Sequence, residues 1–78
     1  MSTSTDDDDW LLAERRAIGD RIRRIREDRN LTQDAVFLAV PISRSSYQEI
    51  ESGQQNATIN TLLRIARVLR VHVADLLR

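Results

Sequence analysis

The residue types that usually carry enzyme chemistry are scarce in this chain of 78 residues. It has no cysteine, which excludes disulfides, thiolate metal sites and a cysteine nucleophile. The single histidine, His72, cannot form a zinc site alone and has no serine and carboxylate at a recognisable spacing. The two glycines, Gly19 and Gly53, are isolated, so no phosphate-binding loop is indicated. The sequence therefore predicts no enzyme, no cofactor and no metal.

Hydrogen bonding to the edges of bases is a chemistry that does fit the polar segment opening at Ser43. Arg44 can donate two hydrogen bonds to O6 and N7 of guanine, because its planar guanidinium matches those acceptors. Gln48 can pair with adenine, and Glu49 can accept a hydrogen bond from N4 of cytosine. The segment therefore favours a nucleic-acid partner.

The distribution of charge favours the same partner, although the formal net charge is zero. Four of the twelve acidic residues are the aspartates at 6–9. Without them, residues 10–78 hold eight acids against twelve bases, a net charge of about +4. Every base is an arginine. Codon bias is the simpler explanation for the absence of lysine, but the positive body suits a polyanion in either case.

The first nine residues differ from the rest of the chain. Residues 1–9 are polar and acidic without apolar periodicity, which predicts a disordered tail before a single domain over 10–78. A first helix is predicted over 10–29, with Asp8 or Asp9 as its cap. Asn30 is expected to end this helix, because asparagine tolerates a left-handed backbone. The apolar stripe of the helix consists of Leu11, Ile18, Ile22 and Ile25.

Two short helices are predicted on either side of Pro41. Thr32 is the expected N-cap of the first, and Pro41 ends it because proline disfavours helical geometry in the residue before it. Ser43 caps the second, over 44–52, which closes at Gly53. This arrangement is that of a helix-turn-helix, whose second helix enters the major groove of DNA.

Two further helices complete the predicted fold. Thr58 is the expected N-cap of the fourth, and a short fifth helix covers 73–77. No strand pattern, secretory signal or apolar run long enough for a membrane helix is found. We therefore predict an all-α protein, a compact five-helix bundle that is soluble and cytoplasmic. The core face of the fourth helix consists of Ile59, Leu62, Leu63, Ile65, Ala66 and Leu69.

Residues 18–77 resemble the lambda-repressor-like family of phage Cro and repressor proteins, also called the XRE family, over about three quarters of the chain. The segment Asn56-x-Thr58-Ile59 is also similar to restriction–modification controller proteins, a subgroup of that family. The matching positions are Ile18-Gly19-x-Arg21-Ile22-Arg23-x-Ile25-Arg26, Leu31-Thr32-Gln33, Ile42-Ser43-Arg44-Ser45, Ile50-Glu51-x-Gly53, Thr58-Ile59-x-Thr61-Leu62, Ile65-Ala66-x-x-Leu69 and Leu76-Leu77.

The resemblance implies a sequence-specific DNA-binding regulator of transcription, with repression as its expected outcome. The glutamine that matches Gln33 bonds a DNA phosphate in the family, where the start of a helix already presents free amides to an anion. The opening turns of the third helix read bases, and the loop that follows contacts the backbone. The implied base contacts are Ser43, Arg44, Ser45, Gln48 and Glu49, and the implied phosphate contacts are Thr32, Gln33, Gln54, Asn56 and Thr58.

The resemblance also implies a buried ion pair between Arg26 and Glu51, which makes Glu51 structural. Several of the implied contacts have simpler readings: Arg44 could contact only phosphate, Glu49 could face away, and Asn56 could be a turn residue. Tyr47 is expected to pack or to bond at a helix edge rather than to stack on bases.

Two residues depart from the family pattern. Phe37 stands where alanine is usual, at the close contact of the two helices, and Pro41 stands where glycine is common. An aromatic ring there should push the helices apart or turn toward the edge of the core. Leu38 and Ala39 replace polar surface residues, and they either enlarge a buried face or mark a surface for a partner.

A single module of this size covers half a recognition site, so we expect a homodimer on a near-palindrome of double-stranded DNA. Trp10 and the two leucines after it are expected to cover the core of their own chain. The acidic tail could lie against basic surface and reduce nonspecific binding. The alternative function is a protein-interaction module on the same fold, such as an antitoxin or adaptor. The candidates for the dimer interface are Leu63, Val68, Val71, Val73, Leu76 and Leu77.

Overall fold

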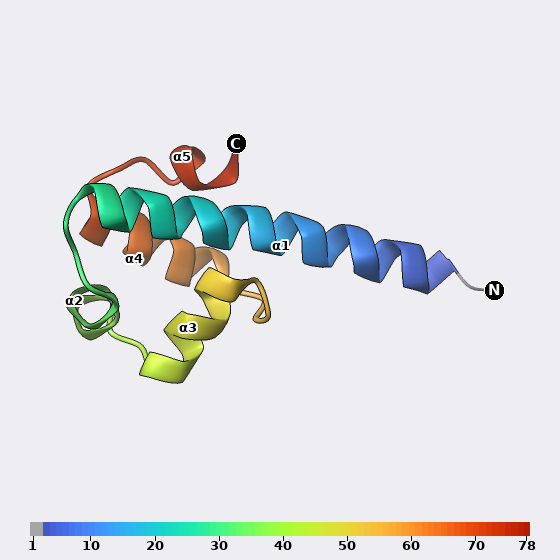
Figure 1. The fold of residues 1–78 in the computed structure, drawn as a ribbon, viewed down its shortest axis with the longest axis horizontal. Helices are drawn as coiled ribbons and strands as arrows, with labels where there is room; N and C mark the ends of the chain where they lie inside the picture. The colour runs from blue at the N-terminus through green and yellow to red at the C-terminus, as the bar shows by residue number, and fades with distance from the viewer. Residues whose placement is uncertain (1–2) are drawn as a thin grey trace.

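The computed structural model describes residues 3–78, and within them it contains five α-helices and no strand. The predicted all-α, five-helix bundle is confirmed. None of the helices in this part of the chain is both long and apolar enough to cross a membrane. The helices are α1 (Thr3–Asp28), α2 (Gln33–Ala39), α3 (Arg44–Ser52), α4 (Ile59–Leu69) and α5 (Ala74–Leu77) (Figure 1).

Helix α1 begins at Thr3, where the sequence pattern predicts a disordered tail before a helix starting at Trp10. Aspartates in the first turns of a helix interact favourably with its positive end, which stabilises helical geometry in this acidic segment. Residues 1–2 of the predicted tail lie outside the described residues. At the other end α1 stops at Asp28, and Asn30 has the expected left-handed backbone, with φ of 57°.

Side-chain caps set the starts of the next three helices, as predicted. The hydroxyl oxygens of Thr32, Ser43 and Thr58 each accept a hydrogen bond from a backbone N–H in the first turn, at 3.0 to 3.1 Å. Helix α2 stops before Pro41, and α3 closes at Gly53 with a φ of 82° that favours glycine. Local sequence signals therefore fix the lengths of the two helices of the helix-turn-helix.

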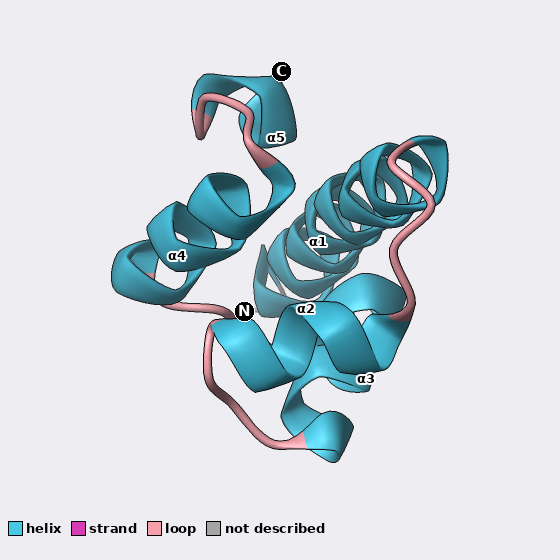
Figure 2. Cartoon of the chain, turned by 90° about the vertical axis from the view of Figure 1, so that its left-hand side faces the viewer, coloured by secondary structure: helices cyan, strands magenta, loops and turns pink. Residues whose placement is uncertain are grey.

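All five helices contribute to one core. In Figure 2, α1 stands on one side, α4 and α5 on the other, and α2 and α3 lie below. Helix α5 is tied to α1 by a hydrogen bond from Nη1 of Arg21 to the carbonyl oxygen of Leu76 (2.9 Å). The buried apolar side chains are Ile22, Val36, Phe37, Val40, Tyr47, Ile50, Leu62, Ile65, Ala66, Leu69 and Leu76.

Helices α1 and α3 approach each other so closely that only glycine fits between them. A Cβ atom at Gly19 would lie 2.5 Å from the carbonyl oxygen of Ile50 and closer still to that of Glu51. Both neighbours are backbone atoms, which cannot move aside as a side chain would. The absence of a side chain at Gly19 thus lets the end of α3 rest directly on α1.

The first half of α1 does not cover the core. Trp10 is 61% exposed and Leu11 is 44% exposed, so the expectation that these side chains shield their own chain is wrong. The helix extends past the other helices at this end (Figure 1), and the core stripe makes its contacts only from Ile18 onward.

Candidate nucleic-acid interface

Helix α3 presents its polar side chains to solvent. Ser43, Arg44, Ser45, Gln48 and Glu49, the five residues implied as base contacts, are all exposed. The opposite face of the helix carries the two residues that hold it in the core, Tyr47 and Ile50. The amphipathic division leaves the first two turns of α3 free to enter a groove.

Part of this exposed face is hollowed. A shallow depression of about 300 Å³ is lined only by polar residues, and three of them belong to the implied base contacts. Gln54, an implied phosphate contact, lines the same depression, so the loop after α3 continues the surface of the helix. The lining residues are Ser45, Gln48, Glu49, Ser52 and Gln54.

The arginine at the start of α3 is held by two residues of α2. Nη2 of Arg44 lies 3.3 Å from Oδ2 of Asp34, and the guanidinium carbon lies 5.4 Å from the centre of the Phe37 ring. An arginine over an aromatic face is attracted by the ring quadrupole. Both Arg44 and Asp34 remain more than half exposed, so the arginine can leave this position at little cost.

Phe37 is accommodated inside the molecule. Its ring is buried, and its centre lies 6.5 Å from that of Tyr47 at a tilt of 45°. The ring therefore fills the contact between α2 and α3 and forms the floor under Arg44. Leu38, in contrast, is 70% exposed and Ala39 is also exposed, so the reading of these two residues as a larger buried face is wrong.

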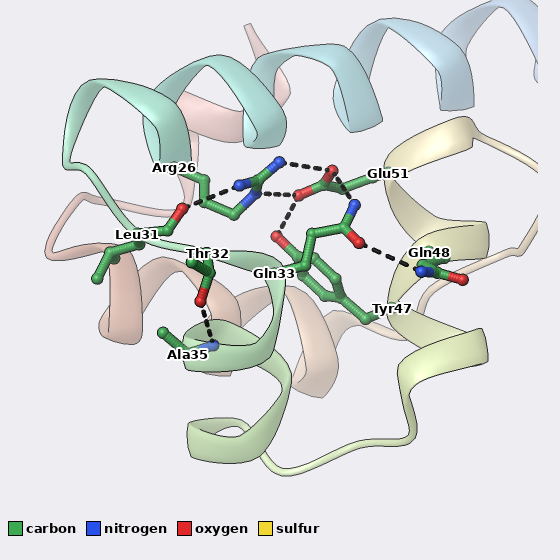
Figure 3. Close-up of polar contacts among 8 residues, drawn as sticks. All are labelled: Arg26, Leu31, Thr32, Gln33, Ala35, Tyr47, Gln48 and Glu51. Atoms are coloured by element: carbon green, nitrogen blue, oxygen red, sulfur yellow. Dashed lines mark hydrogen bonds and ion pairs between the residues drawn. The ribbon is translucent and has the colours of Figure 1, made fainter.

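A chain of hydrogen bonds connects the exposed face of α3 with the interior (Figure 3). Nε2 of Gln48 donates to Oε1 of Gln33 at 3.3 Å, and Nε2 of Gln33 donates to Oε1 of Glu51 at 3.1 Å. These two side-chain hydrogen bonds connect the start of α2 with the middle of α3. Gln33, an implied phosphate contact, and Gln48, an implied base contact, are thus neighbours.

The ion pair implied for Arg26 and Glu51 is present and buried. Nε of Arg26 lies 2.7 Å from Oε2 of Glu51, and Nη2 lies 3.3 Å from Oε1. Nη1 of the same arginine donates to the carbonyl oxygen of Leu31 at 2.9 Å, which fixes the chain between α1 and α2. The hydrogen bond to Glu51 raises the pKa of Arg26, so the arginine stays charged throughout. The pair positions α2 and α3 relative to α1 (Figure 3).

Tyr47 completes the surroundings of Glu51. Its hydroxyl donates to Oε2 of the carboxylate, and the side chain is fully buried. Burial and this hydrogen bond raise the pKa of Tyr47 far above its ordinary range. The tyrosine therefore packs and hydrogen-bonds inside the protein, as expected, and is not available to stack on bases.

The remaining implied phosphate contacts fall into two groups. The hydroxyls of Thr32 and Thr58 already accept hydrogen bonds as N-caps, but both residues are exposed. Asn56 is exposed as well, and it borders a small pocket with Arg15 and Ile18, away from the depression on α3. Thr32 is therefore adjacent to Gln33 at the start of α2, whereas Asn56 and Thr58 belong to the loop before α4.

Two residues at this surface escaped the sequence analysis. Asp34 contacts Arg44, and Nε2 of Gln55 donates to Oε1 of Glu49 at 3.2 Å. Asp34 directly follows Gln33, an implied phosphate contact, so an acid at this position was a signal that the sequence contained. Nothing in the sequence marked Gln55 as a contact of α3, because Glu49, which accepts its hydrogen bond, lies on the other side of the turn at Gly53.

The six candidates for a dimer interface differ in exposure. Leu63 and Leu77 are exposed at 46% and 47%, whereas Leu76 is completely buried in the core of its own chain. Leu76 therefore cannot contribute its side chain to an interface without unfolding α5. The other three, Val68, Val71 and Val73, are partly buried against the core.

Known proteins match this chain in sequence pattern and in structure. A family model described as helix-turn-helix matches residues 22–76. The crystal structure of the restriction-modification controller protein C.AhdI from Aeromonas hydrophila has a TM-score of 0.80 at 26% identity, covering 82% of this chain and 97% of that one. The crystal structure of the clp gene regulator ClgR from C. glutamicum has a TM-score of 0.77 at 28% identity, covering 81% and 82%. No curated protein sequence shows a significant match.

Proposed function

Because the chain belongs to the helix-turn-helix family of DNA-binding transcriptional regulators, we propose that it represses transcription by binding a near-palindromic operator as a dimer. The family and the two solved neighbours are regulators, not enzymes. In this proposal the first turns of α3 lie in the major groove and the start of α2 contacts the phosphate backbone. In this proposal the protein acts in the cytoplasm, together with the DNA that it binds.

The exposed polar face of α3 is the observation that carries the proposal. Arg44, Ser45 and Gln48 offer donors that match base edges, and the buried pair of Arg26 and Glu51 holds their helix at a fixed angle. A protein-binding surface should instead present aromatic or aliphatic anchors at its centre. The face of α3 has none, which favours DNA over the alternative of an antitoxin or adaptor.

Direct reading of bases is assigned to Arg44 first, with Gln48 second. Arg44 rests over Phe37 at the start of α3, and its guanidinium is exposed, so it can turn to O6 and N7 of guanine. Gln48 is held by Gln33, which we place on a phosphate. A glutamine that is fixed in this way offers a defined pair of donor and acceptor to adenine.

A dimer is proposed because one α3 covers only half of a typical operator. Helices α4 and α5 offer the exposed apolar side chains for it, Leu63 and Leu77, with Ile59 also exposed at 64%. An interface of this kind would leave α2 and α3 of each copy free for adjacent turns of the duplex.

Selection of bound sequences from random duplexes tests the proposal. We expect a near-palindrome whose half-sites are separated by one helical turn, about 34 Å, or a multiple of it. The variant Arg44→Ala should lose about 1–3 kcal/mol of binding free energy at one base position. The matched control is Arg24→Ala on α1, an equal loss of charge at an exposed residue outside the proposed DNA contacts and the proposed dimer interface.

Three other outcomes would count against specific parts of the proposal. Failure to bind any duplex at low salt would favour the protein-interaction module. An equal loss on every sequence for Arg44→Ala would leave Arg44 as a phosphate contact only. A single, non-repeated recognition element would contradict the dimer.

A further inference from the structure

Among the residues that the structure describes, the first half of α1 has no partner. Arg15 is the most N-terminal residue whose side chain bonds another helix or loop in the described part of the chain, through Nε to the carbonyl oxygen of Gly53 (2.9 Å). Before it, residues 3–14 form a helix that extends past the bundle (Figure 1). This segment continues α1 without a break, so it needs no nucleus of its own, but packing of an apolar face would stabilise it further.

An apolar face is available on this segment, and it is flanked by opposite charges. Asp8, Leu11, Leu12 and Arg15 stand at positions i, i+3, i+4 and i+7, which places them along one side of the helix. Leu11 is 44% exposed, and Leu12 is partly exposed. Only Nε of Arg15 is engaged by Gly53, so the two Nη groups remain free to bond a carboxylate.

This stripe is complementary to itself when two copies run antiparallel. Residue numbers that face each other then add to a constant, so Leu11 of each copy meets Leu12 of the other and Asp8 meets Arg15. Two leucine contacts and two ion pairs result, and the antiparallel helix dipoles attract as well. The neighbouring stripe of Asp7, Trp10, Leu11 and Glu14 lacks this property, because it would place an acid against an acid.

We propose that α1 pairs antiparallel with α1 of a second copy of this chain along Asp8, Leu11, Leu12 and Arg15. The contact covers about two turns of helix, so it is small and the association depends on protein concentration. The paired segment lies at the opposite end of the molecule from α2 (Figure 1). The family model begins only at residue 22, so the stripe lies outside the part of the chain that family membership explains.

Charge reversal tests the pairing by sedimentation equilibrium without DNA. Asp8→Arg opposes two arginines in a pair of identical copies, and Arg15→Asp opposes two aspartates. We expect each variant to show a lower mass than the original chain at high concentration, and half of it where α1 makes the only contact between copies. A 1:1 mixture of the two variants should regain the original mass, because the introduced arginine of one copy then faces the introduced aspartate of the other.

Two more variants keep the result independent of folding. Leu11→Glu places a charge on an exposed position and should lower the mass in the same way while the circular dichroism stays helical. Asp9→Arg makes the same charge change as Asp8→Arg, one residue and about 100° further round the helix, and should leave the mass unchanged. The proposal is overturned if the mixture stays at the lower mass, if Asp9→Arg has the effect instead, or if all variants match the original chain. The DNA-binding proposal is unaffected by any of these outcomes, since no DNA is present.

Discussion

The hydroxyl of Tyr47 donates a hydrogen bond to the carboxylate of Glu51, one turn later on the same helix. The carboxylate also receives Arg26 from α1 and Gln33 from α2, so one buried acid joins three helices. Each of its two oxygens accepts two hydrogen bonds, which compensates for its removal from water. The position of the polar face of α3 therefore depends on the groups around Glu51.

Replacing Tyr47 with phenylalanine should weaken this centre without disturbing the packing. The ring beside Phe37 is retained, but Oε2 of Glu51 loses its second donor. A hydrogen bond to a charged group contributes about 1.5–3 kcal/mol, so the free energy of unfolding should fall by roughly that amount. Urea denaturation followed by circular dichroism measures it. An unchanged midpoint and slope would show that the hydroxyl contributes nothing.

The same tyrosine should make the protein sensitive to alkali. Burial and the hydrogen bond to Glu51 raise the pKa of Tyr47 above its ordinary value of 10.0, so the unfolded chain releases the phenol proton at lower pH than the folded chain. The stabilisation is complete below pH 10 and is lost as the pH rises beyond it, by up to about 1.4 kcal/mol per pH unit.

Tyr47 is the sole tyrosine of the sequence, so phenolate absorbance reports this group alone. We expect phenolate to appear together with the loss of helicity. Phenolate formation near pH 10 in a fully helical protein would contradict the prediction. In Tyr47→Phe the stability should depend less on pH over the same range.

Removing Arg26 should be more damaging than removing any surface arginine. Arg26→Met leaves the carboxylate of Glu51 buried without its countercharge, at a cost of about 3–5 kcal/mol. The whole domain is held by roughly 5–15 kcal/mol, so α2 and α3 should lose their fixed arrangement at moderate temperature. Thermal denaturation measures this against Arg23→Met, whose partner Asp20 is on the surface. Equal melting temperatures for the two variants would refute the structural role of the pair.

Gly19→Ala provides a test in which two effects have opposite signs. Alanine favours a helix over glycine by about 1 kcal/mol, so the variant should be more stable if Gly19 were only a helix residue. Its Cβ would instead collide with the backbone at Ile50 and Glu51, and α3 would have to move away from α1. We expect a lower melting temperature. An increase would show that the two helices are not in close contact.

The starts and ends of the helices could be predicted because their signals are local. Thr32, Ser43 and Thr58 cap through their own first turns. Pro41 follows the end of α2 as predicted, but Val40 before it keeps helical angles (φ −58°, ψ −46°), so the expected effect of proline on the preceding residue is not seen. Arg70 ends α4 with φ of 61°, a conformation to which an arginine gives no clue. Glycine or asparagine would have signalled it. Helix ends can therefore be predicted only where the residue at the end is of a type that favours the backbone conformation found there.

Contacts across the fold could be predicted only where the family resemblance supplied them. The pair of Arg26 and Glu51 came from that resemblance, but the contact of Asp34 with Arg44 spans two helices and follows no periodicity. The prediction that Leu38 is buried failed for the same reason. The sequence shows that a residue is apolar, but not whether another part of the fold covers it. The chemistry of the candidate site was therefore predictable, and its supporting contacts were not.

Asp34→Asn should raise the affinity for DNA while making it less selective. The acid lies at the start of α2, beside the proposed phosphate contact Gln33. Its removal therefore abolishes an electrostatic repulsion between the Asp34 carboxylate and the phosphates of any duplex. It also releases Arg44 from an exposed ion pair worth up to about 1 kcal/mol, a gain of at most about five-fold. Without Asp34, the side chain of Arg44 can turn to a phosphate as well as to a base, so the ratio of specific to nonspecific binding should fall. Fluorescence anisotropy with the selected operator and a scrambled duplex measures both the affinity and this ratio.

Glu27→Gln, an equal change of charge on α1, is the control and should alter the affinity and the ratio less than Asp34→Asn does. Weaker binding of Asp34→Asn to both duplexes would mean that Asp34 holds Arg44 in the orientation that DNA requires.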